Sequence, residues 1–232
     1  LSQKISGKNY KKKIDVVSKF LQKEKSDYLF ITAPENVAWL LNIRGYDNPN
    51  SPIPNCRLLI TKNKKFFLIA EKSKLKKLLF EKKINISQIT EPTNLENLFL
   101  KLKKGKIIVD SKTLSLFFKK IIKNKFEILD KKDPIYLLKS IKNKTEIYNM
   151  INAHIIDGVA LTKFLYWIKV LNKKTITEYQ AQKKLEAFRK KNKQYLFPSF
   201  NTIAGAGKNG AIVHYRATKK KTKVIKKGDV FL

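Results

Sequence analysis

Cysteine, arginine and long apolar runs are all scarce in this sequence. Cys56 is the single cysteine, so the chain can form no internal disulfide and offers no cysteine cluster for a metal. A chain without disulfides is typical of a reducing compartment, which favours the cytoplasm. The apolar runs at residues 58–60 and 66–70 are far below the ~20 residues that a membrane helix needs. The N-terminus lacks the three-part pattern of a signal peptide.

Acidic residues are few beside basic ones: 18 Asp and Glu face 51 Lys and Arg, a net charge of +33. Such a balance is typical of nucleic-acid binders. However, only four of the basic residues are arginines, the type favoured for bidentate phosphate and base contacts. The lysines are spread along the chain, and Lys shares A/T-rich codons with the abundant Ile, Asn, Phe and Tyr. We interpret the charge as a solvated coat and expect salt-sensitive polyanion binding but no specific nucleic-acid partner.

The remaining composition favours a folded protein, because 43% of the 232 residues are hydrophobic. Residues 10–129 alternate helical and strand patterns. Helical spacing around Ile14 and a helix start at Pro34 accompany strands expected at 27–32, 57–60, 65–70, 84–89, 106–110 and 125–129. Further helices are expected at 73–80, capped by Ser73, after a capping box at Thr93 and Glu96, and at 113–122. This alternation predicts an α/β domain over residues 1–130.

A polar segment at residues 130–134 is the expected linker to a second domain at 131–232. Long helices follow, with an apolar face from Ile141 to Ile168 and a second helix that begins after Thr177 as N-cap. A Gly-rich, β-like section extends from Tyr195 and ends in an apolar run where we expect a strand. The pattern predicts an α+β domain. Because the chain starts at Leu1 and stops inside this run, we expect residues to be missing at both ends.

Three segments together resemble the long form of aminopeptidase P. They are APENVAWLLNIRG at residues 33–45, LKSIKNKTE at 138–146 followed by Met150, Ala153-His154 and Asp157-Gly158-Val159-Ala160, and the stretch from Pro198 that includes NTIAGAGKNGAIVHYRAT and ends at 232. The resemblance implies a creatinase-like α/β middle domain at residues 1–130, followed by the N-terminal part of a truncated α+β pita-bread catalytic domain at 131–232.

By the same resemblance, the full-length protein removes the N-terminal residue from peptides with proline in second position. The resemblance implies two divalent metal ions, manganese in the usual case, held by two Asp, two Glu and one His that lie beyond residue 232. It also implies a homodimer. Two close metals supply a hydroxide nucleophile and need several converging oxygen ligands. We see no such convergence in this sequence, so we expect no metal ligand and no peptidase activity in the 232 residues alone.

His214 is the main candidate site residue, because the resemblance places it in the substrate pocket, where an imidazole can hydrogen-bond substrate. Arg44 is a second candidate substrate contact, since family dimers place middle-domain residues near active sites; a domain or subunit contact is the alternative for this residue. Packing is expected for Trp39 and a structural role for His154. A phosphate loop at Gly205, Gly207 and Gly210 is rejected, because the lysine of the segment is followed by Asn. We expect these glycines to serve a tight connection.

Two other functions remain open from the sequence. Some pita-bread proteins lack metal ligands and act as histone- or nucleic-acid-associated binding modules, and the positive charge is compatible with that class. A creatine or dipeptide hydrolase fits less well, because residues 33–45 resemble the aminopeptidase more closely. An Asp-Ser-Gly sequence directly after residue 232 would favour the enzyme.

Overall fold

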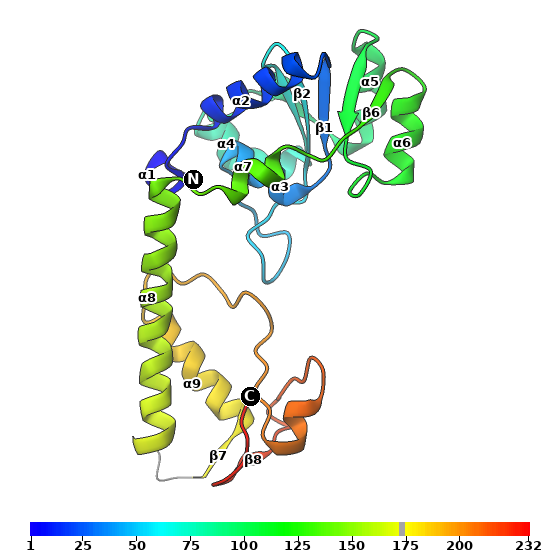
Figure 1. Cartoon of the computed structure of the whole chain (residues 1–232). Helices are drawn as coiled ribbons and strands as arrows, with labels where there is room; N and C mark the ends of the chain where they lie inside the picture. Colours follow the sequence, from blue (N-terminus) through cyan, green and yellow to red (C-terminus); the bar gives the residue numbers. More distant parts are fainter. Residues whose placement is uncertain (172–174) are drawn as a thin grey trace. The chain divides into compact units, whose positions relative to one another are not determined.

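The computed structural model describes residues 1–171 and 175–232, which divide into two compact units, Leu1–Glu146 and Ile147–Leu232 (Figure 1). Each unit is described by itself. Within the parts of the chain that the structure describes, no helix combines the length and apolar character needed to cross a bilayer.

A mixed six-stranded sheet forms the centre of the first unit, with the order β4-β3-β2-β1-β5-β6. Its strands are β1 (Tyr28–Ile31), β2 (Arg57–Thr61), β3 (Phe66–Ile69), β4 (Ile89–Thr90), β5 (Lys106–Val109) and β6 (Glu127–Asp130). The β1–β2 and β2–β3 pairs are antiparallel, whereas β1–β5, β5–β6 and β3–β4 are parallel. The central strands are continuous apolar runs because helices cover both faces of the sheet.

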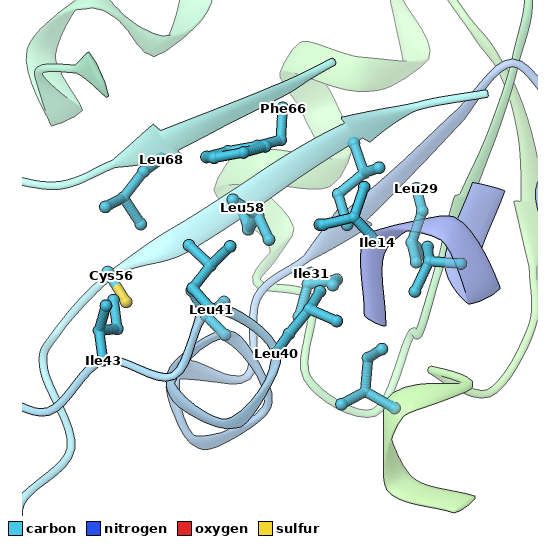
Figure 2. Packing of buried hydrophobic residues seen from close by; sticks show 14 of the residues in the cluster. Ile14, Leu29, Ile31, Leu40, Leu41, Ile43, Cys56, Leu58, Phe66 and Leu68 are labelled. Carbon is cyan, nitrogen blue, oxygen red and sulfur yellow. The ribbon is translucent and has the colours of Figure 1, made fainter. Parts of the chain in front are cut away.

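The two faces of the sheet carry separate hydrophobic clusters. Leu29, Ile31, Leu58 and Ile60 belong to the cluster on the face covered by helices α2 (Tyr10–Lys23), α3 (Pro34–Leu41) and α7 (Ile135–Ser140). The close-up shows Leu29, Ile31 and Leu58 in this cluster (Figure 2). Phe30, by contrast, packs edge-on against Phe99 of α5 and Phe118 of α6 on the other face. The helices of this unit are α1 (Gln3–Ser6), α2 (Tyr10–Lys23), α3 (Pro34–Leu41), α4 (Lys76–Phe80), α5 (Leu95–Lys101), α6 (Leu116–Lys123) and α7 (Ile135–Ser140).

Several predicted elements of the first unit are confirmed and several are not. The helix at Ile14, the helix start at Pro34 and the β2–β3 hairpin are confirmed. The predicted strand at 84–89 is wrong, because η2 (Ile86–Gln88) occupies half of it and β4 begins only at Ile89. The expected caps at Ser73 and Thr93 are also wrong, since both residues lie inside 3-10 turns, η1 (Lys72–Leu75) and η3 (Pro92–Asn94).

The first unit extends beyond the boundary that the sequence predicts at residue 130. Within the predicted linker, Asp133 is buried and accepts hydrogen bonds from Asn36 Nδ2 at 2.7 Å and from Ile135 N at 2.9 Å. Ile135 is fully buried in the cluster under α3. Because these contacts join α7 to the first unit, that unit ends at Glu146 instead of residue 130.

The second unit contains most of α8 (Lys144–Tyr166), which continues as η4 (Trp167–Leu171), and α9 (Glu178–Lys190). Strand β7 (Ile176–Thr177) pairs antiparallel with β8 (Val224–Ile225), and η5 (Gly207–Ala211) lies between α9 and β8 in the chain. Thr177 is the N-cap of α9 and forms a capping box with Gln180, as its sequence position predicted. The buried cluster of this unit is small and centres on Phe164, Ile176 and Ala181.

Two expectations for the second unit differ from the structure. Most apolar side chains on the predicted face of α8 lie outside the core of this unit's described residues; Ile155, for example, is 59% exposed, whereas Phe164 is buried. The β-like section after Tyr195 is largely irregular, and Phe231 forms only an isolated bridge with Ala206 where we expected a strand. The glycines of this section permit close backbone approach, which favours connections over regular strands.

Candidate functional site around His214

His214 lies in the second unit, in the turn that follows η5. Its side chain is exposed, and its backbone has a φ of 56°, in the left-handed region that few non-glycine residues adopt. The N–H of the next residue, Tyr215, donates to the Ile212 carbonyl at 3.1 Å and closes the turn. The structure therefore presents the imidazole of His214 to solvent on a tight turn.

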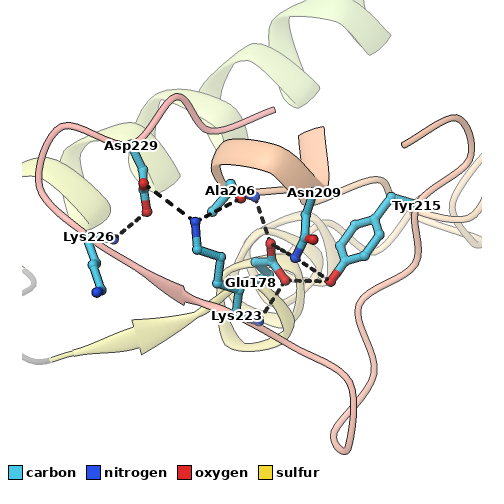
Figure 3. A network of polar contacts seen from close by, with 7 residues as sticks. All are labelled: Glu178, Ala206, Asn209, Tyr215, Lys223, Lys226 and Asp229. Carbon is cyan, nitrogen blue, oxygen red and sulfur yellow. Dashed lines mark hydrogen bonds and ion pairs between the residues drawn. The ribbon is translucent and has the colours of Figure 1, made fainter. Parts of the chain in front are cut away.

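A buried carboxylate, Glu178, holds the residues around this turn (Figure 3). Glu178 begins α9 and is 0% exposed. It accepts hydrogen bonds from Ala206 N at 2.7 Å, Asn209 Nδ2 at 2.9 Å, Tyr215 OH at 2.7 Å and Lys223 N at 2.8 Å. Both carboxylate oxygens are thus satisfied, and three connecting segments are tied to one side chain.

The charges in this cluster follow from burial and hydrogen bonding. Burial by itself would raise the pKa of Glu178, but the donors from Ala206, Lys223, Tyr215 and Asn209 lower it overall. Burial, and then the hydrogen bond to this carboxylate, raises the pKa of Tyr215 to about 12. Glu178 is therefore an anion at neutral pH, and Tyr215 is a neutral hydrogen-bond donor.

The glycines before the turn have a steric function. A Cβ on Gly205 would come within 2.8 Å of the Asn209 backbone, and Gly207 has a φ of 57°. Gly205 also exchanges backbone hydrogen bonds with Leu232, at 3.2 Å and 2.9 Å. These contacts explain the glycines by close backbone approach and left-handed geometry.

Arg44, the second predicted site residue, belongs to the first unit. Its Nη1 donates to the carbonyls of Ala38 at 3.3 Å and Ile43 at 2.8 Å, and so satisfies acceptors at the carboxyl end of α3. His154 lies on α8, where its Nδ1 is 2.8 Å from the Met150 carbonyl of the preceding turn. The structure gives both residues local contacts, and within the second unit His154 makes none of the hydrogen bonds of the Glu178 cluster.

Sequence reasoning did not find Glu178 or a second buried group, Lys13. Lys13 Nζ donates to Trp39 O and Asn42 Oδ1, both at 2.8 Å, and lies 3.8 Å from the centre of the Trp39 ring. Trp39 Nε1 in turn donates to Glu146 at 2.9 Å. The sequence signal for Lys13 was its position beside Ile14 on the buried stripe of α2. The sequence signal for Glu178 was its position as an acidic residue directly after the N-cap Thr177.

The described residues do not fit a metal centre. They contain no group of three or more His, Cys, Asp or Glu side chains arranged to hold a metal ion. Glu178 is surrounded by donors instead of other ligands, as Figure 3 shows. We therefore derive no step through a metal from these residues.

Comparisons with known proteins cover both units. Residues 1–146 match the Creatinase/Prolidase N-terminal domain, and residues 148–232 match Metallopeptidase family M24. Xaa-Pro aminopeptidase 1 of Dictyostelium discoideum is 34% identical over 98% of the chain, which spans 37% of that protein. Xaa-Pro aminopeptidase ApepP of Drosophila melanogaster is 32% identical, with 98% and 38% of the two chains covered.

A solved structure supports the fold. The X-prolyl aminopeptidase of Caenorhabditis elegans, described as a cytosolic enzyme with a di-nuclear active site, matches all of this chain and 39% of its own with a TM-score of 0.87 at 24% identity. The predicted fold classes, creatinase-like α/β and then pita-bread, are confirmed. The chain spans well under half the length of these relatives. It belongs to the creatinase/prolidase N-terminal domain family, continues into an M24 metallopeptidase domain, and is homologous to the Xaa-Pro aminopeptidases.

Proposed function

We propose that this chain is part of an aminopeptidase that releases the N-terminal residue from peptides with proline in second position. The observation that carries the proposal is the match to curated Xaa-Pro aminopeptidases over 98% of the chain, across both of its units. An exposed imidazole on a fixed turn is the local feature that such an enzyme can use. His214 would donate or accept a hydrogen bond at the peptide, since the two ring nitrogens of an imidazole can serve both roles.

The metal chemistry of this proposal belongs to residues outside the chain. Two divalent metal ions, which we propose to be manganese, supply a hydroxide nucleophile when bound. Since the described residues form no ligand cluster, we propose that these 232 residues alone are inactive. We also propose a cytoplasmic location and a homodimer. A contact between Arg44 and the substrate stays a prediction.

The test uses the complete product of the gene that contains these 232 residues. With Mn²⁺ present, it should release the first residue from a peptide with proline in second position, and much more slowly from a matched peptide with alanine there. Release should be measured by chromatography of the free amino acid. Equal rates for the two peptides would contradict the substrate assignment. Absence of turnover, together with histone or nucleic-acid binding that persists at a salt concentration that abolishes non-specific polyanion binding, would favour the non-catalytic binding module instead.

A further inference from the structure

We propose that Glu178 is a positioning residue for His214: its buried carboxylate closes the loop of residues 209–215 at both ends and thereby fixes the direction of the imidazole. The effect of Glu178 on turnover rests on the proposed function. Its effect on the direction of the His214 imidazole does not. Figure 3 shows the geometry, with Asn209 and Tyr215 both directed at the carboxylate.

The carboxylate reaches parts of the chain that are far apart in sequence. Its donors lie 28, 31, 37 and 45 residues away, at Ala206, Asn209, Tyr215 and Lys223. A carboxylate with 0% exposure is costly to bury unless hydrogen bonds replace its water. Four donors converge on the carboxylate, so these segments are arranged around a negative charge. A neutral side chain of the same shape would not accept all four hydrogen bonds equally well.

Both ends of the loop that carries His214 meet this one side chain. Asn209 Nδ2 donates to Oε1 at 2.9 Å, and Tyr215 OH donates to Oε2 at 2.7 Å. Asn209 Nδ2 also lies 3.0 Å from the Tyr215 hydroxyl, which joins the two ends directly. Because His214 lies inside this closed loop and next to Tyr215, a shift of either end changes where its side chain points.

Hydrophobic packing holds only one end of this loop. Tyr215 is 5% exposed, whereas Ile212 and Val213, on the other side of His214, are 50% and 83% exposed and contribute little to a core. His214 also keeps a left-handed backbone, which is strained for a non-glycine residue and persists only where surrounding contacts impose it. The Glu178 hydrogen bonds are the contacts at both ends that can impose it.

The first test reads the imidazole directly on this chain by nuclear magnetic resonance. The sequence has two histidines, so selective labelling gives one reporter at His214 and one internal reference at His154 on α8. In Glu178→Gln, we expect the ring signals of His214 to shift and its motion to increase, while those of His154 stay unchanged. Tyr215→Phe keeps the buried ring and removes only the hydroxyl, so it should have the same effect on His214. It serves as the test variant if Glu178→Gln fails to fold.

Glu186→Gln is the matched control, because Glu186 is on the same helix and its partners are the side chains of Lys183 and Lys190. It should leave both histidines unchanged. Unchanged His214 signals in folded Tyr215→Phe and Glu178→Gln would overturn the proposal. A shift in both histidines in these variants would also overturn it, because it would indicate a general loss of structure.

The second test measures catalysis in the complete gene product. Glu178→Gln should lower kcat/KM for a proline-containing peptide by about 10- to 100-fold, the range that small misplacements of site groups cause. In a His214→Ala background the same change should have no further effect, while its effect on the thermal midpoint remains. Equal losses in both backgrounds would overturn the positioning role. If the unsubstituted product lacks turnover, the proposed function fails, and the resonance experiment alone decides on Glu178.

Discussion

At Lys13 the fold places an ammonium group between helices α2 and α3. The residue is 2% exposed, its Nζ donates to Trp39 O and Asn42 Oδ1, and it lies over the Trp39 ring. Burial lowers the pKa of Lys13 to about 8, although the nearby Glu146 carboxylate acts in the opposite direction. The buried Lys13 ammonium of the first unit therefore loses its proton near pH 8, well below the pH at which an exposed lysine does so.

The pKa of Lys13 predicts a rise in stability on the alkaline side. An unfolded lysine titrates near its model value of 10.5, so between about pH 8 and 10 the unfolded chain binds more protons and the folded state gains relative stability. We expect the unfolding free energy of the parent chain, minus that of Lys13→Met, to increase by about 1 kcal/mol from pH 7 to 9. Urea unfolding at the two pH values measures it. A difference that is constant or that falls with pH would contradict the burial of Lys13.

At the scale of elements, the packing of α7 against α3 determines where the first unit ends. Ile135 is fully buried under α3, whereas Leu137 on the same short helix is 66% exposed. Asp133 and Asn36 add a buried hydrogen bond of 2.7 Å between the segment before α7 and α3. A helix with one residue in the core and a neighbour in water is part of the unit, not a linker.

Alanine substitutions in α7 test this assignment. Ile135→Ala should destabilise the first unit by about 2–4 kcal/mol, because it leaves a cavity in the cluster. Leu137→Ala is the matched control on the same helix and should stay within about 0.5 kcal/mol. In a Trp167→Phe background, which removes the tryptophan of the second unit, chemical unfolding followed by tryptophan fluorescence reports on the first unit through Trp39. Similar small effects from both substitutions would show that α7 is a tether between units after all.

Elements with local signals were predictable from the sequence, and contacts between distant segments were not. The β2–β3 hairpin and the capped start of α9 follow from turn residues and capping within a few positions. Asp133 reads as a polar linker residue because its partner, Asn36, is 97 residues away. Glu178 reads as an ordinary first-turn acid for the same reason. His214 was found only through the family resemblance, and its left-handed turn was not predicted at all.

For the whole molecule, the strong positive charge and the candidate site have separate origins. The net charge of +33 comes from a lysine excess along the entire sequence, whereas the buried carboxylate cluster around Glu178 depends on specific geometry. We propose that this chain supplies the substrate-facing turn at His214 and that the metal ligands lie elsewhere in the protein.

Manganese uptake tests this division most directly. Loss of the free Mn²⁺ signal in electron paramagnetic resonance should be compared, at one salt concentration, for the 232-residue chain and for the complete gene product. We expect no saturable uptake by the chain and two Mn²⁺ ions per molecule of the complete product. Saturable uptake of two ions by the chain alone, or none by the complete product, would contradict the account.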